Sequence, residues 1–204
     1  MRNFDYSKLK NLRWSNEVLS YVAQINQKKG KQETFLNYKS EQLDRLVEIA
    51  KIQSTEASNA IEGIYTTNIR LKQLIDEKTT PKNRDEEEIA GYRDVLNIIH
   101  ESSDYISITP NYILQLHKIL YAHSIKKEIG GRFKSVQNYI SATDGNGKPV
   151  NIFTPLSPYE TPIAIEKICE EFNREIKNMD IDPLILIPIF IHDFLCIHPF
   201  LDGN

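Results

Sequence analysis

Apolar residues recur at three- and four-residue steps along most of the chain, the spacing that places them on one face of an α-helix. In residues 39–63 they form one long stripe, and Gly63 is the expected end of that helix. The same spacing predicts further helices over residues 14–27, ended by the charged run 28–31, and over residues 66–75, 85–100, 111–123 and 162–176. The pattern therefore predicts a mostly helical protein.

The last apolar stretch, residues 184–197, is nearly continuous and predicts a buried helix after Asp182-Pro183. Pro188 lies inside it. Because a proline inside a helix costs about 3 kcal/mol or more, we expect this helix to begin after Pro188 or to kink there.

The helical pattern stops at Gly130-Gly131, and two short runs with strand character follow at residues 136–141 and 150–153. Between them lies Asp-Gly-Asn-Gly at positions 144–147, residue types that favour tight turns. We therefore predict one β-hairpin in an otherwise helical chain.

Composition narrows the class of protein. Of the 204 residues, 40% are hydrophobic and 26% are charged, which is typical of a globular chain and excludes collagen-like and disordered classes. Lys plus Arg number 25 against 28 Asp plus Glu, a net charge of −3, so nucleic acid is not indicated as a partner. Two cysteines are too few for a disulfide framework and favour a reducing cytoplasm. Polar residues interrupt the best apolar run, so no membrane span is expected.

The last seven residues, 198–204, contain the most informative chemistry. His198 can accept a proton at neutral pH, Asp202 supplies a carboxylate that suits Mg²⁺, and Gly203 permits close approach of the backbone to an anion. These groups together can handle a phosphate ester with a divalent metal. A helix end followed by a turn would contain the same residue types, so the residues alone leave both interpretations open.

Residues 198–204, His-Pro-Phe-Leu-Asp-Gly-Asn, resemble the first seven positions of the Fic-family signature HxFx(D/E)GNGRxxR. Residues 58–63, Ser-Asn-Ala-Ile-Glu-Gly, resemble the family's inhibitory motif (S/T)xxxE(G/N), placed upstream as in the subclass with an N-terminal inhibitory helix. Further segments follow in the order that the family shows, and these are Leu116-His117, Gly131-Arg132-Phe133, the predicted hairpin and Pro155-Leu156-Ser157-Pro158. The resemblance covers residues 14–204.

The resemblance implies an all-α Fic fold, a helical bundle that carries one β-hairpin, called the flap. It places an N-terminal helical region at residues 1–105, with the inhibitory helix at about 40–63. The Fic core follows at residues 106–204, with the flap at about 133–153. The implied activity is that of a protein adenylyltransferase, which transfers AMP from ATP to a hydroxyl group of a target protein.

The resemblance also assigns roles to residues of the last segment. His198 would deprotonate the target hydroxyl, and Asp202 would hold the Mg²⁺ that bridges two phosphates of ATP. Gly203 and Asn204 would begin the anion cradle, and Phe200 would anchor the segment in the core. The flap would dock the target protein by pairing its edge with an extended segment.

Glu62 and Ser58 receive regulatory roles from the resemblance: Glu62 as the inhibitory glutamate and Ser58 as a support for its carboxylate. Each also has a plain structural interpretation, since Glu62 directly precedes a C-capping glycine and Ser58 can bond back to its own helix. His117 and His192 lie among apolar neighbours and are interpreted as core histidines bonded to backbone, outside the site. The acidic run 86–88 is interpreted as a solvated helix start.

The chain ends at Asn204, so the next glycine and both arginines of the signature are absent from it. Because those arginines hold the nucleotide phosphates in the family, we expect an incomplete catalytic domain with weak or no transfer. Three other functions stay open: transfer of another phosphate-containing group, removal of AMP from a modified protein, and a non-catalytic binding or regulatory module. The target protein and the oligomeric state, a homodimer included, stay open as well.

Overall fold

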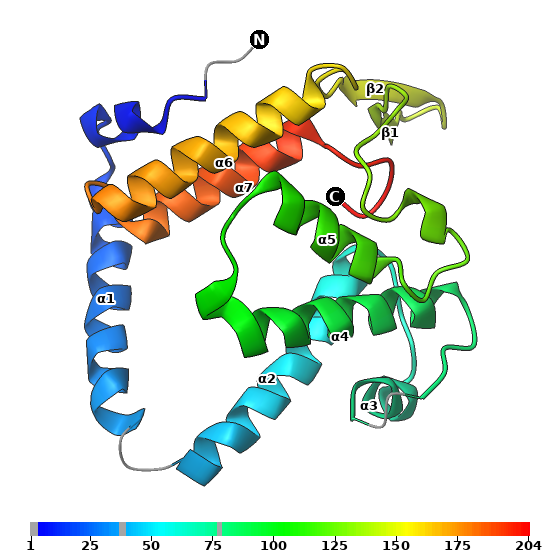
Figure 1. Ribbon diagram of the computed structural model, residues 1–204, viewed down its shortest axis with the longest axis horizontal. Helices are drawn as coiled ribbons and strands as arrows, with labels where there is room; N and C mark the ends of the chain where they lie inside the picture. Colours follow the sequence, from blue (N-terminus) through cyan, green and yellow to red (C-terminus); the bar gives the residue numbers. More distant parts are fainter. Residues whose placement is uncertain (1–3, 37–39, 77–78) are drawn as a thin grey trace. The chain divides into compact units, whose positions relative to one another are not determined.

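The computed structural model describes residues 4–36, 40–76 and 79–204 (Figure 1). The chain divides into two compact units. One unit consists of Met1–Lys10 together with Ser102–Asn204, and the other of Asn11–Glu101. The fold is mostly helical with one two-stranded antiparallel hairpin, as the sequence predicts.

The unit of residues 11–101 is built from α1 (Asn16–Leu36), α2 (Ser40–Ile61), α3 (Asn68–Asp76) and α4 (Arg84–Ser102). Its small core consists of Leu71, Leu74, Ile75 and Ile89, with Ile52 and Ile64 packed against them. The last turn of α2 closes as predicted. Gly63 takes a φ of +75°, and its N–H donates to the Ala60 carbonyl oxygen at 3.1 Å. The Ile64 N–H donates to the Asn59 carbonyl oxygen at 3.0 Å, which completes a Schellman motif.

Two details of this unit differ from the sequence prediction. Helix α1 does not end at the charged run 28–31 but continues to Leu36, because lysine, glutamine and glutamate are themselves good helix formers. Glu86 is not solvated: it is 3% exposed and accepts hydrogen bonds from the Arg70 guanidinium, the closest at 2.7 Å. The Arg70 guanidinium lowers the pKa of Glu86 to about 2, so the carboxylate stays charged. The ion pair joins α3 to the first turn of α4.

The other unit contains α5 (Pro110–Leu120), α6 (Thr161–Asn178) and α7 (Pro183–Ile197), with short 3₁₀ helices at Tyr6–Asn11, Ser103–Tyr105 and Lys127–Ile129. Helices α6 and α7 lie side by side (Figure 1). Their buried residues form most of the core: Ala164, Ile165, Ile168 and Cys169 from α6, and Leu186 and Ile197 from α7. Thr109 caps α5, since its Oγ1 accepts a hydrogen bond from the Tyr112 N–H at 3.3 Å.

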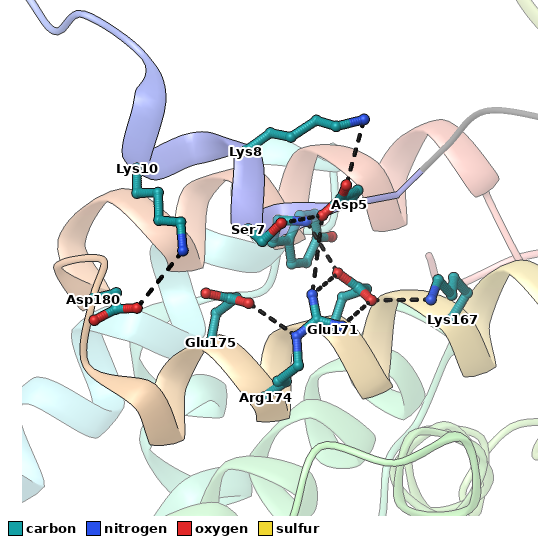
Figure 2. Close-up of polar contacts among 10 residues, drawn as sticks. Asp5, Ser7, Lys8, Lys10, Lys167, Glu171, Arg174, Glu175 and Asp180 are labelled. Carbon is teal, nitrogen blue, oxygen red and sulfur yellow. Dashed lines mark hydrogen bonds and ion pairs between the residues drawn. The ribbon is translucent and has the colours of Figure 1, made fainter.

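The N-terminal segment completes this core. Phe4, Tyr6 and Leu9 are buried in it, although the sequence of this segment is mostly polar and charged. The Tyr6 N–H donates to Glu171 Oε2 of α6 at 3.2 Å, and Glu171 also accepts from Arg174 and Lys167 (Figure 2). Three apolar side chains spread over a short segment give no helical or strand period, so the sequence pattern did not predict this packing.

Helix α7 begins at Pro183 and contains Pro188, so of the two expected outcomes, a start after Pro188 or a kink there, the later start is excluded. Asp182 caps it, because its Oδ1 accepts a hydrogen bond from the Leu184 N–H at 2.8 Å. The cost of Pro188 is the hydrogen bond that its missing N–H cannot donate, and the buried side chains of Leu186 and Ile197 hold the helix in the core on either side of it. In the described parts of the chain, no helix is both long and apolar enough to cross a membrane.

The flap pairs β1 (Ile140–Thr143) with β2 (Pro149–Phe153) in antiparallel register. Asp144 closes the predicted turn, since its Oδ1 accepts from the Asn146 and Lys148 N–H groups, each at 2.8 Å. The first strand begins at residue 140 and not at 136 as predicted. The preceding residues instead pack toward the C-terminal loop, where the Asn138 amide donates to the Phe200 carbonyl oxygen at 3.0 Å.

Candidate active site

His198 stands directly after α7 in the left-handed backbone conformation, with φ of +50° and ψ of +65°. Its N–H donates to the Phe194 carbonyl oxygen at 2.9 Å and so caps the helix. For a residue with a Cβ this conformation costs roughly 1–2 kcal/mol, although histidine tolerates it better than most. Met179 takes the same conformation at the end of α6, so at His198 it sets the direction in which the chain leaves α7.

The environment of His198 keeps its ring neutral. The side chain is half-buried, and burial together with the positive charge of Lys134 lowers the pKa of His198 below its usual value of 6.5. A neutral imidazole at pH 7 can accept a proton, which is the state that a general base requires.

Lys134 holds the end of α7 in place. It is 3% exposed, and its Nζ donates to the Ile197 carbonyl oxygen at 3.1 Å and to Asn138 Oδ1 at 2.9 Å. Its backbone N–H donates to the Pro199 carbonyl oxygen at 2.8 Å. Burial lowers the pKa of Lys134 to about 8, so the ammonium is still charged at pH 7 beside His198. Two carbonyl groups that flank His198 are therefore fixed by one buried lysine.

The loop after His198 is closed by its own last side chain. Asn204 Oδ1 accepts from the Phe200 N–H at 2.7 Å, and Asn204 Nδ2 donates to the Phe200 carbonyl oxygen at 3.0 Å. Phe200 is 2% exposed, so the predicted core anchor is observed. The side-chain amide of Asn204 thus shapes the loop. Only the backbone N–H of Asn204 would then contribute to the predicted anion cradle.

Asp202 and Gly203 lie at the tip of this loop. The Asp202 side chain is 44% exposed; its Oδ1 accepts from the Gly203 N–H at 3.1 Å, and its Oδ2 lies 3.9 Å from Lys126 Nζ. Gly203 has a φ of +72°, and a Cβ there would lie 2.8 Å from the Tyr121 ring. Only glycine fits this position, which brings the backbone close to α5.

The residue types at the tip suit a magnesium ion that is held chiefly by a nucleotide. Among the described residues, no group of three or more His, Cys, Asp and Glu could form a metal cage. Mg²⁺ commonly takes only one or two carboxylates together with substrate phosphates, and the partly exposed Asp202 fits that pattern. On α7, His192 Nδ1 lies 3.5 Å from Asp193 Oδ1.

The two histidines left out of the site have different surroundings. His117 is 4% exposed and bonded to backbone, as predicted, but one of its partners is the carbonyl group of Asp202 at 3.0 Å. The His192 side chain is 62% exposed, so its interpretation as a core residue was wrong. Helix α7 is apolar around most of its circumference, and this pattern does not reveal which side faces the core; Ile187, Ile191 and Leu195 are exposed on it as well.

Glu62 and Ser58 belong to the unit of residues 11–101. Glu62 is exposed and follows the last residue of α2, in the turn that Gly63 closes. Ser58 Oγ accepts a hydrogen bond from the Tyr92 hydroxyl at 2.9 Å, so it joins α2 to α4.

The Fic/DOC family matches residues 107–204, which include α5, the flap, α6, α7 and the loop just described. Residues 107–204 form a Fic/DOC family domain. The Fic domain therefore contains His198, Asp202, Gly203 and Asn204 in the segment that resembles the family signature.

Two solved structures are similar to most of the chain, over more residues than the Fic domain alone contains. A Fic domain containing signaling protein from Bacteroides thetaiotaomicron is 26% identical with a TM-score of 0.74, over 88% of this chain and 67% of its own. A Fic family protein from Desulfovibrio desulfuricans is 21% identical with a TM-score of 0.72, over 95% of this chain and 55% of its own, a likeness of fold alone. No curated protein matches the chain.

Three residues that shape the Fic site were missed by sequence reasoning: His117, Lys134 and Asn138. Lys134 and Asn138 follow the double glycine at 130–131 without any periodic pattern, and only the fold brings them to the end of α7. The one available signal was the resemblance itself, which includes the segments around positions 117 and 131–133.

Proposed function

We propose that this Fic domain is a Mg²⁺-dependent protein adenylyltransferase, which transfers AMP from ATP to a hydroxyl group of a target protein. The observation that carries the proposal is the loop 198–204, where a neutral imidazole at a strained helix end precedes an exposed carboxylate by four residues. The Fic/DOC family implies a nucleotide substrate, which supports this assignment.

His198 would accept the proton of the target hydroxyl group as its oxygen attacks the α-phosphorus of ATP. The bond between the α-phosphorus and the bridging oxygen breaks, and pyrophosphate leaves. Asp202 would hold Mg²⁺, which when bound offsets negative charge on the departing pyrophosphate. Gly203 and Asn204 would present backbone N–H groups to the phosphates, from a backbone that the missing Cβ at position 203 lets lie against Tyr121.

The flap would dock the target protein. Every residue of β1 and β2 is exposed, and a two-stranded sheet has unpaired edges that can add a strand. Because edge pairing uses main-chain groups, the side chains of the flap define the target only in part.

The proposal is tested with two proteins: the 204-residue chain, and an extended chain in which the Fic signature continues after Asn204 with Gly-Arg-x-x-Arg and the helices that follow it in the family. Each is incubated with a lysate and with ATP labelled at either the α- or the γ-phosphorus. We expect the extended chain to incorporate the α-label and not the γ-label, and the 204-residue chain serves as the comparison.

Each alternative function gives a different result, in this assay or in a companion measurement of label release or of ATP and partner binding. Incorporation of the γ-label would indicate phosphoryl transfer, and release of label from a previously adenylylated protein would indicate removal of AMP. Retained binding of a partner protein without detectable binding of ATP would favour a non-catalytic module. Any of these results would contradict adenylylation as the main activity.

Regulation by Glu62 is part of the proposal. Its carboxylate lies in an exposed turn whose geometry is fixed by the Schellman motif at Gly63 and by the bond between Ser58 and Tyr92. A fixed turn of this kind suits a carboxylate that pairs with an arginine of the completed signature and so competes with ATP. Ser58 would then act by holding the end of α2 against α4.

Replacing Glu62 by glycine in the extended chain is expected to raise AMP transfer by about 5–150-fold, the usual range of coupling between a regulatory contact and a site. Glu62→Gln is expected to raise it as well, since the charge is removed in both variants. Incorporation of α-label per minute measures the effect. The matched control is Glu56→Gln, the same charge change at an exposed position of α2. Equal rates in all four proteins would exclude self-inhibition by Glu62.

A further inference from the structure

The His117 ring lies between two backbone groups from separate segments of the Fic domain. The Gly131 N–H, in the loop that precedes the flap, donates to Nδ1 at 3.0 Å. On the other side of the ring, Nε2 lies 3.0 Å from the carbonyl oxygen of Asp202. A single side chain of α5 thus connects the segment before the flap with the candidate active-site loop.

These two contacts define the tautomer of the ring. Because the Gly131 N–H is a donor, Nδ1 must be the acceptor and carries no hydrogen. The hydrogen of the neutral ring then lies on Nε2, from which it is donated to the Asp202 carbonyl oxygen. Each ring nitrogen has one role, and exchanging the two roles would place two donors together on one side and two acceptors on the other.

Packing prevents the ring from turning. His117 is 4% exposed and stacks on Phe200, with ring centroids 3.7 Å apart and planes 3° from parallel. Gly131 has a φ of +74°, and a Cβ there would lie 3.0 Å from the Lys118 side chain, so its close approach to α5 requires glycine. Close packing therefore holds the ring in place for both hydrogen bonds, the one from Gly131 and the one to Asp202.

We propose that His117 is a positioning residue of the Fic site: its Nε2–H fixes the Asp202 peptide group, and thereby the direction of the Asp202 carboxylate and of the Gly203 and Asn204 amides. Its importance for catalysis rests on the proposed function, whereas its effect on the loop does not. A purely apolar ring of the same size would fill the space beside Phe200 but would leave the Gly131 N–H and the Asp202 carbonyl group without this bridge.

The test uses ¹⁵N NMR on the 204-residue chain and three variants. Long-range ¹H–¹⁵N spectra report the tautomer of His117, and amide exchange reports the Gly131 hydrogen bond. His117→Phe keeps a stacked ring and loses both hydrogen bonds, and His117→Gln keeps a donor and an acceptor. The matched control is His192→Gln, which replaces an exposed histidine of the same domain by glutamine.

We expect a hydrogen on Nε2 and none on Nδ1 in the unmodified chain. In His117→Phe the Gly131 amide should exchange about tenfold faster, the loss of one hydrogen bond, and the amide signals of Asp202, Gly203 and Asn204 should shift. In His117→Gln the Gly131 exchange rate and the loop signals should lie between those of His117→Phe and those of the unmodified chain. In His192→Gln both should match the unmodified chain. In the extended chain, His117→Phe should lower kcat for AMP transfer about 10–100-fold, with partial rescue by glutamine.

A hydrogen on Nδ1, or loop signals that are unchanged in His117→Phe, would overturn the proposal. If His117→Phe does not fold, the tautomer and the loop signals of His117→Gln decide the question. If the extended chain transfers no AMP while the loop signals still respond as expected, the proposed function fails and the positioning of the loop by His117 stands.

Discussion

Replacing His198 by alanine in the extended chain is expected to lower kcat/KM for AMP transfer by about 10²–10⁴-fold, the usual contribution of a general base. The reason is chemical: without the imidazole, no group at the strained end of α7 accepts the proton of the target hydroxyl. The stability of the domain should change little, because the His198 side chain is only half-buried. Steady-state transfer of α-labelled AMP measures the rate.

The pH dependence of the unmodified extended chain provides a second test of His198. Only the neutral ring is a base, so the rate rises as pH rises through the pKa of His198 and then levels off. Because burial and Lys134 lower that pKa, the midpoint of the rise should lie below pH 6.5. His192→Ala serves as the control and should leave the profile unchanged. A rate in His198→Ala close to that of the control, or a midpoint above pH 6.5, would contradict the assignment.

Replacing Phe200 by alanine is expected to lower the free energy of unfolding of the domain by about 3–5 kcal/mol, as for other buried phenylalanines. Phe200 is 2% exposed, stacks on His117, and lies near Phe133 and Phe194, with ring centroids 6.0 and 6.2 Å away. Truncation leaves a cavity under the active-site loop. Urea denaturation of the 204-residue chain measures the change.

The control for this experiment is Phe153→Ala in the flap, where the side chain is 39% exposed. The same atoms are removed, but little close packing is lost, so the free energy of unfolding should fall by less than about 1 kcal/mol. Similar losses in the two variants, or a loss below 1 kcal/mol for Phe200→Ala, would show that the ring does not anchor the loop.

The parts of the site that could be predicted from the sequence are those close together along the chain. His198 and Asp202 are four residues apart, so one short motif shows both, and the helix stop at Gly63 depends on a local backbone conformation. The helices and the hairpin likewise follow from periods of a few residues. Their boundaries were less certain, because α1 continues through a charged run that contains good helix formers.

The support of the site could not be predicted in the same way, because its contacts join distant positions. His117 and Asp202 are 85 residues apart, and Lys134 reaches the Ile197 carbonyl group 63 residues away. Neither side chain has a spacing that marks a site, and a buried lysine is indistinguishable in sequence from an exposed one. The N-terminal segment shows the same limit, since Tyr6 meets Glu171 across 165 residues.

One measurement tests most directly whether His198 and Asp202 serve one bound magnesium nucleotide. It is the Mg²⁺ dependence of AMP transfer by the extended chain with Asp202→Asn or His198→Ala. In Asp202→Asn, the Mg²⁺ concentration for half-maximal transfer should rise about tenfold or more, because a carboxylate ligand is lost. His198→Ala should lower the maximal rate without moving that concentration. Asp144→Asn, in the other Asp-Gly-Asn of the chain at 144–146, should leave that concentration unchanged. An unaltered Mg²⁺ requirement in Asp202→Asn, or undiminished transfer by His198→Ala, would contradict the shared site.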